Sequence, residues 1–301
     1  MKQISLNVYV EDRFSVPPPP NNRGANFGIV TTSEGVVLID PPFLPTDALK
    51  LKKEIAKKGE VRYIINTEQH VDHIAGNSFF PGTVVSHESI KKLFRGPVSS
   101  VVGSERIEEV LKAGLDVIGY YRLLVQERDP EGLSLLRDYQ FREPTITFSE
   151  KMYLYVGSHT FELIYQPGHT QAHIGVHVPQ ERIFFTGDNF AGGTQPSMAH
   201  CVPLEWVRTL EEIEKMELDV VVPGHGQIGN RKQVQEFRHF LLRCIDIVND
   251  AIKQGMSKEE AGERISFEGL HPGDRSREAV HPGAVMQRLN VFRLFEMLSG
   301  Q

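Results

Sequence analysis

Four apolar runs of this chain are each followed, within a few residues, by side chains of the kind that bind metal ions. The runs occupy residues 61–66, 161–165, 183–186 and 220–222, and their composition is typical of buried strands. We expect the four segments that follow these runs to converge on one rim of the fold. Few architectures bring four distant strand ends together, so this pattern constrains the fold more than any other feature of the sequence.

The segments after the runs contain three carboxylates and four imidazoles. They are Glu68, His70, Asp72 and His73 after the first run, His169 after the second, Asp188 after the third and His225 after the fourth. A divalent metal in a hydrolytic site takes imidazole and carboxylate ligands and keeps one position open for water. Each segment alone also fits an ordinary turn, and the first fits a helix N-terminus, but their joint order favours a metal site.

This order and spacing resemble those of the metallo-β-lactamase superfamily, whose signature is H-x-H-x-D-H followed by a lone histidine, a bridging aspartate and a final histidine. The match covers about residues 27–226. The resemblance implies an α/β (α+β) fold, specifically a four-layer αββα sandwich of two mixed β-sheets flanked by helices. It also implies that Asp40, at the end of the apolar run 36–39, supports the ligand loop.

Carried over position by position, the resemblance assigns seven ligands to two divalent metal ions. One ion would be held by Glu68, His70 and His169 and the other by Asp72, His73 and His225, with Asp188 bridging the two. Asp72 would also orient the attacking water or take up its proton, which makes it the candidate catalytic residue. Zinc is the expected metal, with iron or manganese as alternatives.

Glu68 departs from the family signature, which has a histidine at this position. Two divalent ions, two aspartates and a bridging hydroxide leave one net positive charge, and the Glu68 carboxylate brings that charge to zero. A less positive site acidifies its bound water less and attracts anionic substrates less. Two other interpretations remain open. Glu68 could point away and leave a one-metal enzyme, or Gln69 could face the metal, which the spacing to His70 disfavours.

The predicted reaction is hydrolysis, in which a metal-bound hydroxide attacks a carbonyl centre of a small molecule. A lactone or other ester is the first expectation, followed by an amide or thioester. Tyr120, Tyr121 and His200 are weak candidates for substrate contacts. The alternatives are an iron-dependent oxidoreductase of the same fold and a binding protein without catalysis. No G-x-S-x-G motif supports a covalent serine mechanism.

The pattern along the chain predicts one metallo-β-lactamase-like domain over residues 1–301. A turn at 33–35 is expected to join strands 27–32 and 36–40 in a hairpin, and Thr46 to cap a helix over 46–58. Residues 95–142 are expected to form a helical insertion that partly covers the site, and residues 229–301 a helical C-terminal region. One helical face of the tail is expected to pack on the same body or to form a homo-oligomer: Val285, Leu289, Phe292 and Phe295.

Composition narrows the choice of partners and compartment. The formal net charge of -6, with acidic and basic residues interspersed, gives no basic patch for nucleic acid. The composition is not that of a membrane protein, and a small-molecule substrate is the expected partner. Two cysteines, Cys201 and Cys244, are too few for a disulfide framework, and the first residues lack the pattern of a secretory signal. A cytoplasmic protein fits these features best.

Overall fold

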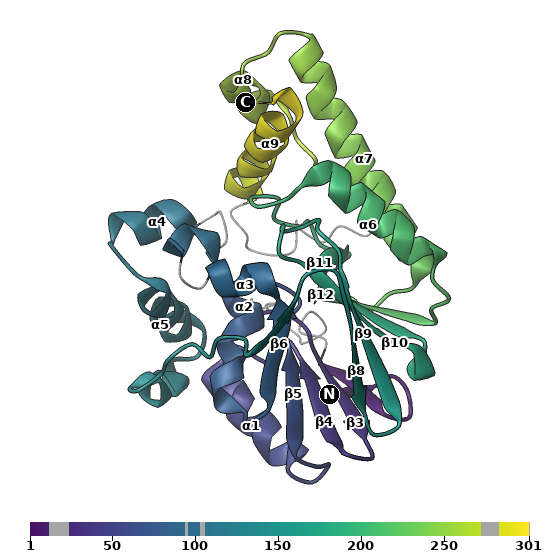
Figure 1. Ribbon diagram of the computed structural model, residues 1–301. Coiled ribbons are helices and arrows are strands. Elements are labelled where there is room, and N and C mark those ends of the chain that lie inside the picture. Colours follow the sequence, from purple (N-terminus) through teal and green to yellow (C-terminus); the bar gives the residue numbers. More distant parts are fainter. Residues whose placement is uncertain (12–23, 94–95, 103–105, 272–282, 301) are drawn as a thin grey trace.

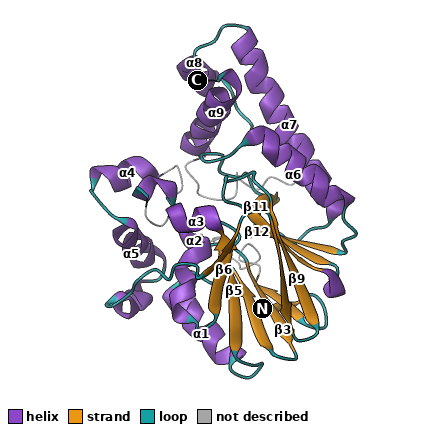
Figure 2. Cartoon of the chain, viewed as in Figure 1, coloured by secondary structure: helices purple, strands orange, loops and turns teal. Residues whose placement is uncertain are grey.

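The computed structural model describes residues 1–11, 24–93, 96–102, 106–271 and 283–300 of the chain. Two mixed sheets lie face to face, and helices cover their outer faces (Figure 1, Figure 2). This is the four-layer αββα sandwich that the sequence predicts.

The first sheet has seven strands whose order follows the chain. The strands are β1 (Lys2–Gln3), β2 (Val8–Glu11), β3 (Phe27–Thr32), β4 (Gly35–Ile39), β5 (Val61–Ile65), β6 (Thr83–His87) and β7 (Ile146–Phe148). Neighbours are antiparallel from β1 to β4 and parallel from β4 to β7. The predicted hairpin of β3 and β4 is confirmed. The short helices α2 (Val71–Ile74), η1 (Ala75–Phe79) and α3 (Glu88–Leu93) follow β5 and β6.

The second sheet has five strands in the order β12-β11-β10-β9-β8. These strands are β8 (Lys151–Val156), β9 (His159–Tyr165), β10 (Ile174–Val178), β11 (Ile183–Gly192) and β12 (Val220–Gly226), with the 3-10 turn η5 (Pro179–Glu181) before β11. All neighbours are antiparallel except β11 and β12, which run parallel.

Alternating side chains explain how both faces of each sheet become buried. In β4, Val37 and Ile39 point into the layer between the sheets, whereas Val36 and Leu38 pack against helix α1 (Pro45–Ile55). On the second sheet, Phe184 faces outward into a cluster with side chains of α6 (Pro203–Lys215) and α7 (Arg231–Lys253). The sandwich therefore has a central core and an apolar layer under each set of helices.

Strand β11 is longer than the sequence suggests. The prediction ended this strand at residue 186, but the structure continues it to Gly192, with register shifts on both sides of Gly187. Gly187 has φ +49°, which glycine adopts without the steric cost that other residues meet. Asp188 therefore lies within an irregular strand and not in a loop beyond it, and His225 likewise lies within β12.

The first helix begins differently from the prediction. Leu44 is the N-cap of α1, the helix starts at Pro45, and it ends at Ile55. Thr46 is therefore not the cap. Its backbone N–H and hydroxyl both donate to the Asp129 carboxylate, at 2.9 Å each. An acceptor 83 residues away in sequence satisfies this helix end, which no local pattern could reveal.

The segment expected as a helical insertion is largely helical in its described part, although residues 137–142 form no helix. Its elements are η2 (Val98–Ser100), α4 (Ile107–Lys112), α5 (Val117–Arg128) and η4 (Pro130–Leu136). Residues 94–95 and 103–105 lie outside the described part. An apolar cluster packs the segment against Phe43, Leu44 and Val71, and it includes Tyr121 and Tyr139, whose ring centroids are 4.8 Å apart.

The C-terminal region contains α7, α8 (Lys258–Arg264) and α9 (Gly283–Ser299). Capping boxes begin α7, at Asn230 and Gln233, and α8, at Ser257 and Glu260. Of the predicted apolar face of the tail, Phe295 is buried and Leu289 and Phe292 are half-buried, while the side chain of Val285 lies outside the described part; Val291 and Leu294 of α9 are buried as well. This face packs against the other helices of the same chain, which is one of the two expected arrangements. A homo-oligomer formed through it stays a prediction.

None of the helices in the described ranges combines the length and apolar character needed to cross a bilayer.

A buried carboxylate ties the edge of the first sheet to the second. Glu181 Oε1 accepts hydrogen bonds from Asn7 Nδ2 at 2.8 Å and, across the second sheet, pairs with His159 Nε2 at 2.9 Å. Burial raises the pKa of Glu181, but the hydrogen bonds from His159, Ser5 and Asn7 outweigh it and hold the pKa below its ordinary value. The stabilisation is therefore complete above the ordinary pKa and is lost as pH falls through the lowered one.

We expect Glu181→Ala to lower the free energy of unfolding by about 1–3 kcal/mol at neutral pH, because buried His159 and half-buried Asn7 lose their acceptor. The difference from wild type should shrink in acid, where the carboxylate is protonated in both states. Urea denaturation at the two pH values measures this. Glu217→Ala is the control, since Glu217 is 86% exposed and its ion pair with Arg182, at 3.4 Å, lies at the surface. An equal loss in both variants would contradict the assignment.

Candidate metal centre

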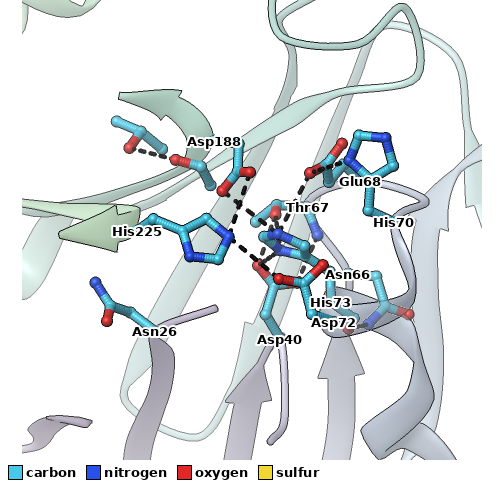
Figure 3. Close-up of polar contacts among 12 residues, drawn as sticks. Asn26, Asp40, Asn66, Thr67, Glu68, His70, Asp72, His73, Asp188 and His225 are labelled. Carbon is cyan, nitrogen blue, oxygen red and sulfur yellow. Dashed lines mark hydrogen bonds and ion pairs between the residues drawn. The ribbon is translucent and has the colours of Figure 1, made fainter. Parts of the chain in front are cut away.

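The seven predicted ligands meet where the two sheets adjoin. The loop and short helix after β5 bring Glu68, His70, Asp72 and His73, and the loop after β9 brings His169. Asp188 and His225 come from the neighbouring strands β11 and β12 of the other sheet. Figure 3 shows the side chains of Asp188, His225 and Glu68 pointing toward His73 from opposite sides. The predicted convergence of four distant segments is therefore present.

The side chains fall into two groups, each able to place its ligand atoms around one ion. The first contains Glu68, His70, His169 and Asp188. In this group, Nδ1 of His70 lies 3.0 Å from Glu68 Oε1 and 3.3 Å from His169 Nε2. Nε2 of His169 in turn lies 3.5 Å from Asp188 Oδ2. Glu68 has no exposed surface.

The second group contains Asp72, His73 and His225. His225 Nε2 lies 3.1 Å from Asp72 Oδ2 and 3.5 Å from Asp188 Oδ2. His73 Nε2 lies 3.4 Å from Asp188 Oδ1. Asp188 thus contacts histidines of both groups, as the bridging position requires.

The polar atoms of this cluster fit a bound cation. Glu68 Oε2, His73 Nε2 and Asp188 Oδ1 are buried and have no hydrogen-bond partner. Burying such atoms is costly unless something compensates them, and divalent ions do so with carboxylate and imidazole ligands. The donor set therefore suits divalent metals, and the residues fit the group that the fold implies. Whether each of the seven binds a metal stays a prediction.

The geometry decides between the readings of the variant position. Glu68 Oε1 lies 3.3 Å from His73 Nε2 and 3.6 Å from His169 Nε2, so Glu68 points into the cluster and not away from it. Gln69 is buried but belongs to neither ligand group.

The cluster strongly shifts the protonation of its members. Burial raises the pKa of Glu68, but His70, His169 and His73 outweigh it and lower that pKa to about 2. Burial lowers the pKa of His225, but Asp188 and Asp72 outweigh it and raise that pKa to about 9. A metal that binds here must displace protons from histidine, so its affinity rises with pH up to about that value.

Asp40 supports the second group from below, as the resemblance predicts for this position. Its Oδ2 lies 2.9 Å from His73 Nδ1, and its carboxylate accepts from the N–H and the hydroxyl of Thr67, at 2.8 and 2.6 Å. Asp40 has φ +49°, a conformation that costs a non-glycine residue about 1–3 kcal/mol and that these bonds maintain. Because Nδ1 of His73 is occupied, Nε2 faces the cluster.

Three asparagines position the ligands and were not predicted. Asn189 Oδ1 accepts from the backbone N–H of His169 at 2.8 Å, and Asn66 Nδ2 donates to the His73 carbonyl at 2.8 Å. Asn26 Nδ2 donates to the carbonyls of Pro223 and Gly226, at 3.0 Å each, on either side of His225. Only the position of Asn189, next to Asp188, gives any hint in the sequence.

The weak substrate candidates have different positions. His200 lies beside the first group, with Nδ1 2.9 Å from His70 Nε2. Tyr121 is fully buried, and its hydroxyl donates to the Phe43 carbonyl inside the insertion cluster, while Tyr120 is also buried there. The structure thus gives Tyr120 and Tyr121 packing roles and brings only His200 to the ligands.

A model of the metallo-beta-lactamase superfamily matches residues 20–225. The chain belongs to this superfamily. The matched region contains all seven candidate ligands and Asp40, and it ends at His225.

Two relatives in this superfamily are hydrolases by name. The chain is 23% identical over 268 residues to a linear primary-alkylsulfatase of Pseudomonas sp. (strain ATCC 19151), covering 79% of this chain and 49% of that protein. It is 23% identical over 237 residues to the Homo sapiens acyl-coenzyme A thioesterase MBLAC2, covering 72% of this chain and 77% of that protein. The chain therefore spans about half the length of the alkylsulfatase. These relatives agree with the predicted class, a hydrolase.

Solved structures share the fold at low sequence identity. A double mutant of the sec-alkyl sulfatase PisA1 gives a TM-score of 0.65 at 16% identity, covering 92% of this chain and 48% of that one. A metallo-beta-lactamase from Pontibacter korlensis gives 0.54 at 20% identity, covering 80% of this chain and 97% of that one.

We expect Asp40→Ala to weaken zinc binding at the second group by about 10–100-fold, because His73 loses the acceptor that fixes its ring. Competition with a chromophoric chelator measures the affinity. Asp250→Ala is the control, since Asp250 is exposed on α7 and forms a surface ion pair with Lys253 at 3.2 Å. Wild-type affinity in Asp40→Ala would show that the carboxylate does not orient His73.

Proposed function

We propose that this protein is a dinuclear metal-dependent hydrolase that acts on a small-molecule ester, a lactone first, and next on a thioester or amide. The observation that carries the proposal is the buried cluster of three carboxylates and four histidines, several of whose polar atoms lack a hydrogen-bond partner. Membership of the superfamily and hydrolase relatives support the reaction class.

A pair of divalent cations supplies, when bound, a Lewis acid for the substrate carbonyl and an acidified water. The residues of the chain provide the surroundings for this chemistry. Glu68, His70 and His169 would hold one ion and Asp72, His73 and His225 the other, with Asp188 between them. His73 and Glu68 have no exposed surface, so they keep water away from the inner side of the cluster.

Asp72 is the best placed of the carboxylates to act on a substrate water. Its side chain is 23% exposed, against 13% for Asp188 and none for Glu68. A carboxylate at the solvent side of a metal cluster can orient a water and accept its proton. His225, 3.1 Å from Asp72 Oδ2, holds that carboxylate in place.

Sulfate ester hydrolysis is a second candidate for the reaction. One relative is named an alkylsulfatase, and a sec-alkyl sulfatase structure of the same fold covers 92% of the chain. The charge of the site opposes this candidate, because the Glu68 carboxylate removes the net positive charge that would attract a sulfate.

Zinc remains the expected metal, and the extra carboxylate makes iron and manganese the alternatives. We expect Glu68→Ala to lose most of the metal from one of two sites, and Glu68→His to keep both, since histidine offers a ligand nitrogen there. Elemental analysis of the purified variants measures this. Glu88→Ala, an exposed carboxylate on α3, is the control. Two fully occupied sites in Glu68→Ala would show that Glu68 is no ligand.

The substrate class is tested with lactones, carboxylic esters, thioesters, amides and sulfate esters. We expect zinc-loaded protein to hydrolyse carbonyl esters, and chelator-treated protein to lose the activity and regain it with zinc. Cleavage of sulfate esters alone would favour the second candidate. Iron-supported oxygen uptake without hydrolysis would overturn both in favour of an oxidoreductase, and tight ligand binding unaffected by metal loss would indicate a binding protein.

A further inference from the structure

His200 lies at hydrogen-bond distance from His70, on the side of the His70 ring that faces away from Glu68 and His169. It lies on the segment between β11 and α6, and its Nδ1 is 2.9 Å from His70 Nε2. The two ring centroids are 5.1 Å apart, with the planes inclined at 34°. On the other side of the same imidazole, His70 Nδ1 faces Glu68 Oε1 at 3.0 Å and His169 Nε2 at 3.3 Å. Each nitrogen of His70 therefore has a defined neighbour.

In a neutral imidazole one ring nitrogen carries the proton and the other offers a lone pair, so the two sides of the His70 ring have different roles. A histidine that offers the lone pair of Nδ1 to a cation carries its proton on Nε2, and that N–H needs an acceptor. In most metal sites a carboxylate or a backbone carbonyl provides this acceptor. Here the atom at hydrogen-bond distance from Nε2 is Nδ1 of His200.

Helix α9 holds the segment that carries His200. Asn290, which is 1% exposed, accepts from the backbone N–H of Met198 at 2.7 Å and donates to the Pro196 carbonyl at 3.0 Å. Arg293, almost one helical turn further on, donates from Nε to the Cys201 carbonyl at 3.1 Å. The backbone is thus fixed on both sides of His200, by hydrogen bonds between residues that are 92 to 94 positions apart in the sequence.

We propose that His200, held by α9, is a positioning residue that accepts the Nε2 proton of His70 and so directs His70 Nδ1 to the first metal ion. The proposal rests on the proposed function insofar as it takes the first group to be a metal site. It gives the C-terminal helix a role in that site, which the family match, ending at residue 225, does not cover.

The test measures zinc affinity and needs no substrate. Wild type, His200→Ala and His200→Asn are titrated with Zn²⁺ against a chromophoric chelator. We expect His200→Ala to weaken the first site by about 10–100-fold and to leave the second site unchanged. His200→Asn should recover most of the affinity, because its amide oxygen can take the position of Nδ1. A residue that only filled space would not be rescued by asparagine, which is smaller than histidine and shares with it only the hydrogen-bond acceptor.

The helix is tested with Asn290→Ala, alone and combined with His200→Ala. Loosening the segment should weaken the first site in the single variant but add little once His200 is absent, because both act through one contact. His239→Ala is the matched control, since His239 is exposed on α7. Circular dichroism verifies that each variant is folded.

The outcomes separate the two proposals. Two zinc ions in wild type with unchanged first-site affinity in folded His200→Ala would overturn the role of His200 and leave the hydrolase proposal intact. Equal weakening by alanine and asparagine, or weakening of both sites together, would also overturn it. A wild-type protein that binds no zinc would overturn the metal centre and this proposal with it.

Discussion

The burial of the Glu68 carboxylate among three histidines is the interaction on which the rest of the site depends. Its Oε1 lies between 3.0 and 3.6 Å from nitrogens of His70, His73 and His169, and none of its surface is exposed. A carboxylate in such a place is stable only while positive charge surrounds it. The neighbouring loops must therefore keep their histidine rings turned inward, and the supporting hydrogen bonds of Asp40, Asn66 and Asn189 have that effect.

The topology explains why this charge cluster can exist at the seam of the sandwich. The parallel pair of β11 and β12 brings Asp188 and His225 side by side, and the register shifts around Gly187 turn Asp188 toward the other sheet. Gly224 leaves the necessary room, because a side chain there would collide with the Asp188 carboxylate. The loop after β9 of the same sheet adds His169, and the loop and short helix after β5 provide the four candidate ligands of the first sheet. Each sheet thus supplies part of both groups.

The sequence was sufficient for the features that have a local pattern. The β3–β4 hairpin and the order of candidate ligands after apolar runs are both visible in periodicity and spacing. The αββα architecture came from the resemblance that those ligands carry. The same resemblance implied the set of seven candidate ligands and the supporting position of Asp40.

What the sequence could not give depends on contacts between distant residues. Asp129 satisfies the start of α1, Asn26 holds the segment around His225, and Asn290 holds the segment that carries His200. None of these polar side chains has a motif around it, because its partner is a backbone atom elsewhere. The length of β11 was missed for a related reason, since its bulges are stabilised by the neighbouring strand and not by its own sequence.

The negative charge of Glu68 acts on both groups of side chains, and not only on the group to which Glu68 belongs. A histidine at this position offers one lone pair and serves one ion, whereas Glu68 Oε1 lies within 3.6 Å of His169 in the first group and 3.3 Å of His73 in the second. Two unit charges 4 Å apart interact by about 4 kcal/mol at the effective dielectric constant of a protein. The carboxylate therefore lowers the positive potential in both groups of side chains, and the electrostatic field at the second group depends on a residue that belongs to the first.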